Sequence, residues 1–498
     1  MGAMIVARAI IGIDALAVLV ALPAMQREFD ASPTDLQWFV NAFLLTYAGL
    51  VALGGRAGDA VGHLLVLRVG MLLFVAASAA GGLAQSTGWL IASRAAQGAG
   101  AALIRPNSET ILASQFGQQE RGRAVGISGS ASTLFMGMAP LIGGLLITTF
   151  SWRAIFYINL PLGLACLALA RMLLPAGKMR HRPVPWGSAP LIMLGLGGLV
   201  FAVMTSREWG WLSPTFISLL AASALILVTV IKRESRLADP LIQVRLFALR
   251  NFSADAGLLT AIQFSVLGFQ VFFVIWMQDV LGFSAIKSGL FALPIILPVL
   301  LCAPLGGALY DRVGSRMPVG AGGMLLAGGL LCAAVTLHYE SYSWLVGSSL
   351  AVGTGIGILI APLFTDAFNV TPPELRGQAQ GVLETTRGMG AALGLAVMGA
   401  VVTHVQGSSL SAVLQRDGRI PISHLHEVER SIGKAVTIQN QAKLPAGIPA
   451  DLLPELKESV TLAVSASLYL GFGVVFLATL VATLLLPRKV PGGEFGTR

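Results

Sequence analysis

Apolar stretches separated by short polar ones run through the whole chain. Most contain about 20 largely apolar residues, which is the length an α-helix needs to cross a bilayer. About fourteen such stretches can be marked, with boundaries good to a few residues: 5–24, 36–55, 65–84, 88–112, 124–148, 155–174, 187–205, 214–231, 254–277, 287–309, 317–337, 343–367, 379–404 and 460–486. The pattern predicts an all-α polytopic membrane protein with about fourteen transmembrane helices.

Composition supports a membrane protein. Of the 498 residues, 55% are hydrophobic and 11% are charged, whereas soluble domains have roughly a quarter of their residues charged. The net charge is +9, but the basic residues lie in short loops rather than one patch, so we expect no nucleic-acid partner. Cys166, Cys302 and Cys332 lie in apolar stretches without disulfide or metal spacing. Asp14 lies in the middle of the first stretch, which we interpret as a spanning helix rather than a signal peptide.

The basic residues also predict the topology. With the N-terminus inside, most of them lie on the cytoplasmic side, from Arg8 onward, whereas the short outer loops keep only Arg27, Arg153, Arg207 and Lys287. This asymmetry is the positive-inside pattern. We therefore expect a multi-pass protein of the inner or plasma membrane with both termini in the cytoplasm.

A polar loop motif occurs twice in the chain. Residues 54–62 and 306–314 share the pattern Gly-Gly-x-x-x-Asp-x-Val-Gly, and 121–126 is echoed by 376–381 at nearly the same offset. Matches in register indicate a duplicated half. The offset equals an even number of predicted helices, so the two halves should have the same orientation, as in transporters built from parallel repeats.

The duplication predicts a division of the chain into four regions. These are a six-helix bundle at 1–174, a cytoplasmic linker plus two inserted helices (187–205 and 214–231) at 175–249, a second six-helix bundle at 250–486, and a cytoplasmic tail at 487–498. The second bundle contains a long outer segment, 405–459. We interpret it as a solvated loop in preference to a functional lid.

Ionisable residues inside a membrane are costly, and each is therefore a functional candidate. The chain has no Gly-x-x-x-x-Gly-Lys-Ser/Thr loop for nucleotide phosphates. We therefore expect no cofactor and a proton gradient as the energy source. Asp14 is the first candidate, because an apolar site favours the neutral form of a carboxyl group, as a proton carrier requires. The alternative is a structural carboxylate paired with an arginine.

Other charged residues extend the candidate set. Arg94 cannot lose its proton, so it would bias a nearby carboxylate or bind an anion, or serve as a buried hydrogen-bond anchor. Arg105 and Glu109 are four residues apart on one helix face, and we favour mutual neutralisation. Glu384, one turn before Arg387, is the second carboxylate candidate. We give little weight to three acids near predicted helix ends, where side chains reach water: Asp255, Asp279 and Asp366.

Glycines and one proline in 124–148 permit close helix contacts and a bend. Seven further residues could line a cavity for a bulky amphipathic solute, although each alone is more typical of packing or of an interfacial anchor: Trp38, Asn41, Phe135, Gln263, Gln270, Phe273 and Trp276.

These motifs resemble those of the major facilitator superfamily, and in particular its fourteen-helix drug:proton antiporter family, over nearly the whole chain. Residues 90–100 are similar to the fourth-helix motif, and 152–163 to the sixth-helix entry signature. The resemblance implies proton coupling by Arg94. It also implies a fifth-helix antiporter motif at Gly126, Pro140, Gly143 and Gly144, and two gating loops with motif residues Gly55, Asp59, Gly62, Gly307, Asp311, Arg312 and Gly314.

We therefore expect a secondary active exporter that exchanges protons for a lipophilic or amphipathic compound by alternating access, as in drug efflux and antibiotic resistance, and that functions as a monomer. Asp14 and Glu384 would load and release the proton, with Arg94 tuning them. The Asp59 and Asp311 loops would latch the cytoplasmic side by capping or pairing with helix ends. Alternatives are an exporter of an endogenous metabolite, siderophore or lipid, a membrane-embedded enzyme, and a non-transporting sensor or scaffold.

Overall fold

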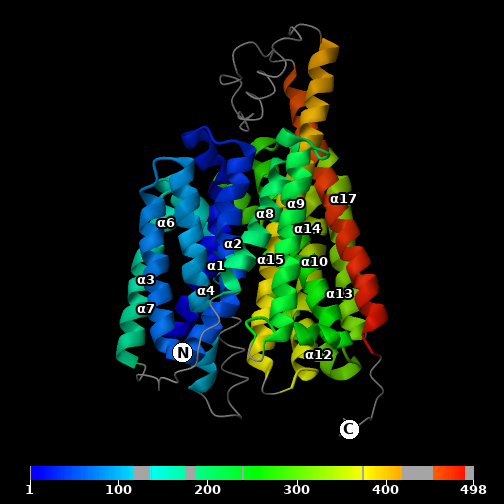
Figure 1. The fold of residues 1–498 in the computed structure, drawn as a ribbon. Helices are drawn as coiled ribbons and strands as arrows, with labels where there is room; N and C mark the ends of the chain where they lie inside the picture. The colour runs from blue at the N-terminus through cyan, green and yellow to red at the C-terminus, as the bar shows by residue number, and fades with distance from the viewer. Residues whose placement is uncertain are drawn as a thin grey trace.

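The computed structural model describes residues 2–115, 135, 137–173, 187–237, 240–372, 375–417 and 452–487. These residues are almost entirely helical. Twelve of their helical segments are long and apolar enough to cross a membrane. The polar α4 and the segment Gly137–Thr149 complete a set of fourteen that matches the predicted stretches one for one. The chain is an all-α polytopic membrane protein (Figure 1).

The first group of helices packs around α4. Both α2 and α3 lie along α4, and α7 contacts α1 and α3. The bounds are α1 (Gly2–Phe29), α2 (Pro33–Val61), α3 (His63–Gly82), α4 (Thr87–Ser114), α6 (Ala154–Tyr157) and α7 (Asn159–Leu173).

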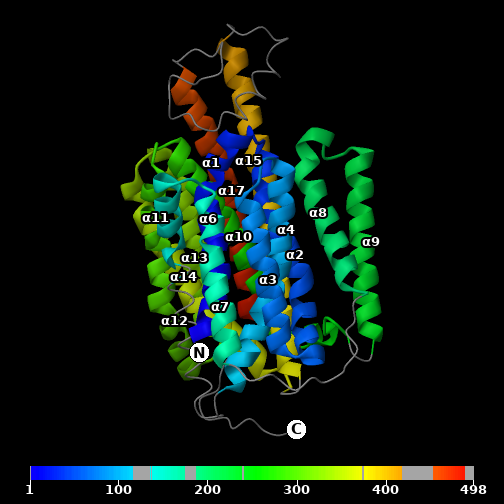
Figure 2. The ribbon, with the colours of Figure 1, turned by 90° about the vertical axis from the view of Figure 1, so that its left-hand side faces the viewer.

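In the second group, α14 packs against α12 and α13, and α10 packs against α15 and α17. The bounds are α10 (Arg250–Asp279), α11 (Ala285–Phe291), α12 (Leu293–Val313), α13 (Arg316–Thr336), η2 (Leu337–Tyr339), α14 (Tyr342–Asn369), α15 (Arg376–Asp417) and α17 (Leu453–Leu485). Between the groups in sequence come α8 (Ala189–Trp209), α9 (Pro214–Arg236) and η1 (Val244–Ala248). α8 contacts α2 and α15, and α9 lies outside it (Figure 2).

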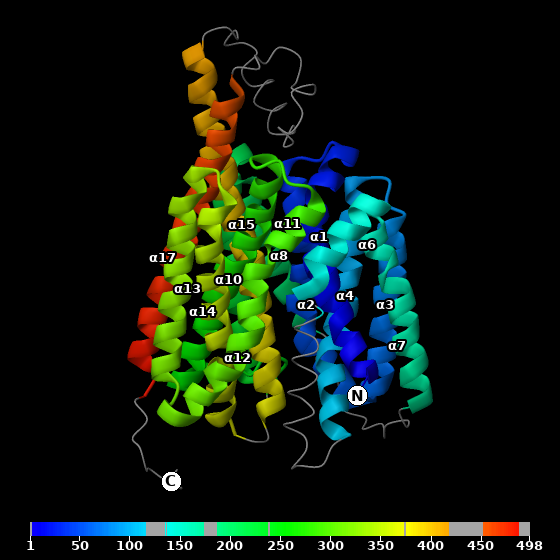
Figure 3. The same cartoon turned by 180° about the vertical axis from the view of Figure 1, so that it is seen from behind.

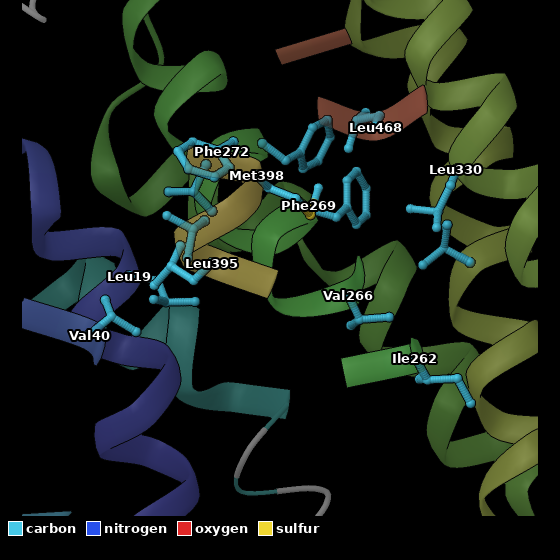
Figure 4. Packing of buried hydrophobic residues seen from close by; sticks show 14 of the residues in the cluster. Leu19, Val40, Ile262, Val266, Phe269, Phe272, Leu330, Leu395, Met398 and Leu468 are labelled. Carbon is cyan, nitrogen blue, oxygen red and sulfur yellow. The ribbon is translucent and has the colours of Figure 1, made fainter. Parts of the chain in front are cut away.

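The two groups meet along α2 and α15 and, toward the outer end, along α1 and α10. Buried apolar side chains fill this seam. Leu19 of α1 and Val40 of α2 lie beside Leu395 and Met398 of α15 (Figure 4). α1 begins and α17 ends at the same end of the molecule, the end at which both termini are expected to face the cytoplasm (Figure 1).

Two predicted boundaries were wrong, and one predicted span contains a break. α15 continues to Asp417 and α17 starts at Leu453, so both ends of the presumed outer loop 405–459 are helical. The two helices project beyond the others in Figure 1, because a helix that enters water is not limited by bilayer thickness. The predicted helix 287–309 is divided into α11 and α12 (Figure 3). Pro294, in the first turn of α12, cannot donate the backbone hydrogen bond that would join them.

Candidate functional site

Asp14 lies near the middle of α1 and is completely buried. Its Oδ2 accepts from Arg94 Nη1 at 2.5 Å. Its Oδ1 accepts from Gln97 Nε2 at 3.0 Å and from Asn159 Nδ2 at 2.8 Å. The donors come from α4 and α7, so this carboxylate joins three helices. We call these four residues the Asp14 network.

Arg94 is 1% exposed and contacts several groups besides Asp14. Its Nε donates to the backbone oxygen of Phe39 at 2.9 Å, its Nη1 donates to Gln97 Oε1 at 2.8 Å, and its guanidinium carbon lies 4.6 Å from the ring centre of Phe43. The contacts expected for a structural role of these two residues are therefore present. Asp14 is paired with an arginine, and Arg94 is a buried anchor.

Two polar residues in and beside the Asp14 network, Asn159 and Ser78, were not predicted as site residues. Asn159 belongs to the sixth-helix signature, yet nothing local indicated that it would reach Asp14. Ser78 of α3 accepts hydrogen bonds from Gln97 at 2.7 Å and from Asn159 at 3.3 Å. Polar residues in an otherwise apolar helix were the available signal.

A second group of charged residues lies where α15 meets α2 and α4. Glu384 is 5% exposed, and its Oε1 lies 3.0 Å from Arg387 Nη1 and 3.5 Å from Arg105 Nη2. Its Oε2 accepts from the Tyr47 hydroxyl at 3.1 Å. With the amide of Gln263 turned so that its oxygen faces Arg387, that oxygen accepts from Nη2 at 2.6 Å and from Nε at 3.1 Å.

Glu109 extends this group. The predicted pairing with Arg105 is confirmed, with Nε and Oε1 3.2 Å apart. Arg8 Nη2 also lies 3.4 Å from Glu109 Oε1, and Gln380 Nε2 donates to Glu109 Oε2 at 3.2 Å. Arg8 lies within α1, inside the predicted stretch 5–24, and its guanidinium reaches this carboxylate. We call the set the Glu384 cluster: Arg8, Tyr47, Arg105, Glu109, Gln263, Gln380, Glu384 and Arg387.

The two copies of the loop motif have the same local structure. Gly62 and Gly314 end α2 and α12 with φ of 102° and 80°, which side chains rarely adopt. A Cβ on Gly54 would collide with the backbone of α4, and one on Gly306 with the backbone of α14. Each copy therefore needs a left-handed turn and a close helix contact. At the second glycine of each pair, Gly55 and Gly307, a Cβ would meet only ordinary contacts.

The acidic motif residues are exposed. Asp59 Oδ1 lies 3.4 Å from His63 Nε2, on the first residue of α3, and His63 Nδ1 lies 2.7 Å from Asn107 Oδ1 of α4. This pairing with a helix start is of the kind expected for a latch. Asp311 and Arg312 are also exposed, at the end of α12.

The fifth-helix motif lies at a contact between the two groups. A Cβ on Gly143 would press on Ala17 of α1, and one on Gly144 would collide with the backbone of α11. In return, a Cβ on Gly289 of α11 would collide with the backbone oxygen of Pro140. The glycines therefore allow backbone-to-backbone contact. Gly126 lies outside the described residues.

The seven cavity candidates contact different helices. Trp38 and Asn41 face α8, through the ring of Phe201 and the sulfur of Met204. Phe273 and Trp276 are buried, and Trp276 Nε1 donates to Thr461 Oγ1 of α17 at 2.9 Å. For these two aromatics the packing alternative holds. Gln263 belongs to the Glu384 cluster, Gln270 is half-buried, and Phe135 is exposed.

The expectation that three acids near helix ends reach water was wrong. Asp255, Asp279 and Asp366 are 0%, 2% and 7% exposed. Neighbouring helices cover these positions, so proximity to a helix end gives their side chains no access to water. Neither Asp255 nor Asp279 receives a hydrogen bond from the described residues.

Comparison with known proteins identifies the chain. A family model described as Major Facilitator Superfamily matches residues 4–395. The chain belongs to this superfamily. Family and fold together point to a membrane transporter rather than an enzyme.

Similar members of the superfamily are resistance and export proteins. The "Multidrug resistance protein Stp" of Mycobacterium tuberculosis is 32% identical over 406 residues, covering 81% of this chain and 75% of the relative. The "Tetracenomycin C resistance and export protein" of Streptomyces glaucescens is 29% identical over 502 residues, covering 97% and 90%. A bacterial homologue of the human lysosomal transporter Spinster, crystallised inward-facing, shares the fold with a TM-score of 0.66 at 17% identity, over 97% of this chain and 95% of the other.

Proposed function

We propose that the protein exports lipophilic or amphipathic compounds across the inner or plasma membrane in exchange for protons. The proton gradient drives it without a bound cofactor, it works as a monomer, and both termini face the cytoplasm. The names of the relatives support export of drug-like solutes: one is a multidrug resistance protein and another exports tetracenomycin C.

The Glu384 cluster is the observation that carries this proposal. Glu384 belongs to α15, but Arg105 and Tyr47 come from α4 and α2 of the other helix group. Alternating access separates the two groups on one side of the membrane. When α15 moves away from α4, Glu384 loses Arg105 and Tyr47 and keeps Arg387 on its own helix. A carboxylate that loses a cationic neighbour binds a proton more readily.

The Asp14 network supplies a second carboxylate of the same kind. Asp14 depends on α4 and α7 for all three of its donors. A shift of α1 against these helices opens the pair with Arg94 and exposes Oδ2 to a proton. Two buried carboxylates whose partners lie on other helices thus link helix movement to proton binding.

Gradient-driven dye transport in proteoliposomes tests the proposal. The probe is ethidium, a lipophilic cation, and an imposed pH gradient is the only driving force. Asp14→Asn should abolish gradient-driven transport and Glu384→Gln should strongly reduce it. Glu458→Gln, at an exposed position of α17, should keep the wild-type rate. If both carboxylate variants transport at the wild-type rate, neither group carries the proton and the proposal fails.

A further inference from the structure

Two buried carboxyl groups face each other at the inner end of the second helix group. Asp255 of α10 is 0% exposed and Asp366 of α14 is 7% exposed. Asn251, one turn before Asp255 on α10, donates to Asp366 Oδ2, so the two carboxyl groups lie on facing turns of α10 and α14. Both oxygens of Asp255 lack any hydrogen-bond donor among the described residues. Asp366 is therefore the polar group that Asp255 meets.

The side chains that donate directly to Asp366 are neutral. Asp366 Oδ1 accepts from the Tyr310 hydroxyl at 3.2 Å, and Oδ2 accepts from Asn251 Nδ2 at 3.1 Å. Ser315 contributes a further side-chain hydrogen bond.

Nearby arginines are engaged elsewhere. Arg250 Nη2 donates to the backbone oxygen of Leu484 at 2.9 Å, and Arg376 Nε donates to that of Phe368 at 3.2 Å. The pair thus differs from Asp14, whose carboxylate lies directly against an arginine.

Two ionised carboxylates cannot hydrogen-bond to each other, because both only accept. Two like charges buried on facing helix turns repel each other, which favours one proton held between the two carboxyl groups. We propose that Asp255 and Asp366 form a proton-binding carboxyl pair that exchanges its proton with the inner aqueous side.

The exchange route is visible in the hydrogen bonds of Asp366. The Tyr310 hydroxyl donates to Asp366 Oδ1 and accepts from Asn369 Nδ2 at 2.9 Å, and Asn369 is exposed at the end of α14. Asp255 itself has no exposed surface. Protons therefore enter and leave at Asp366, next to Tyr310, and Asp255 is the buried partner that retains the proton.

Infrared spectroscopy of the purified full-length protein tests the pair without solute or gradient. A protonated carboxyl group has a carbonyl-stretch band distinct from that of a carboxylate, and the band shifts in D₂O. Wild type should show this band at neutral pH. Asp255→Asn and Asp366→Asn should each remove it, because the new amide donates to the remaining carboxylate in place of the shared proton. Glu458→Gln, at an exposed carboxylate of α17, is the control and should leave the band in place.

If Asp255→Asn and Asp366→Asn both retain the wild-type spectrum, the pair does not share a proton and the inference is wrong. If one variant fails to fold, the other decides. The infrared band is measured without transport, so the two proposals can fail separately. If the band is absent while gradient-driven transport is present, the carboxyl pair is wrong and antiport stands. If the band is present but Asp14→Asn transports like wild type, the pair stands and the assignment of the proton to Asp14 is wrong.

Discussion

The side chains of Asp14 and Arg94 should depend strongly on each other in their contribution to the free energy of unfolding. Arg94 is 1% exposed, and without Asp14 it would keep only Gln97, the Phe39 carbonyl and the ring of Phe43. Removing one partner of a buried pair costs about 3–5 kcal/mol, because the other charge stays buried without compensation. Asp14→Asn and Arg94→Gln should each lower the free energy of unfolding by about 3 kcal/mol. The double variant should cost less than the sum by about 1.5 kcal/mol or more.

The assay is a double-mutant cycle on the free energy of unfolding, measured by reversible denaturation in mixed micelles. The control cycle uses Glu28 and Arg153, a pair of the same type with Oε1 and Nη1 2.6 Å apart but with side chains 42% and 28% exposed. Its coupling should be about 1 kcal/mol or less. If the Asp14 and Arg94 variants add within about 0.5 kcal/mol, the two residues are energetically independent and the argument from the buried pair is refuted.

Three further predictions concern stability. Gly54→Ala should sharply lower the yield of folded protein, because the new Cβ would collide with the backbone of α4. Gly55→Ala should leave the yield nearly unchanged, and equal yields of the two variants would contradict this prediction. Gly62→Ala should lower the free energy of unfolding by about 1–3 kcal/mol, because φ at this position is 102°. Gly88→Ala, whose Cβ meets open space, should have little effect, and equal thermal stability of the two variants would contradict the strain argument. Asn159→Leu should cost about 1–3 kcal/mol by denaturant titration, because Asp14 and Ser78 lose a donor, and an unchanged midpoint would refute this.

Much of the fold could be predicted because the bilayer imposes a length on each helix. The fourteen stretches, the duplicated loop motif and the pairing of Arg105 with Glu109 all follow from spacing along the chain. The extended ends of α15 and α17 could not be predicted, because outside the membrane the length rule no longer applies.

The site was harder to predict, because its contacts join distant parts of the chain. Glu384 meets Tyr47 and Arg105 only because α15 packs against α2 and α4, and no local pattern records that contact. The same limitation explains the misjudged acids. Asp255 lies six residues into α10, where a carboxyl group could have reached water, but α14 covers it.

The central claim is that buried carboxyl groups exchange a proton for solute. The most direct measurement reverses the driving force. Proteoliposomes without a pH gradient receive an ethidium gradient, and a pH-sensitive dye in the lumen reports proton movement. Wild type should move protons against the solute flow, and Asp14→Asn should move none. Proton movement that is the same with and without ethidium, or the same in Asp14→Asn as in wild type, would contradict the account.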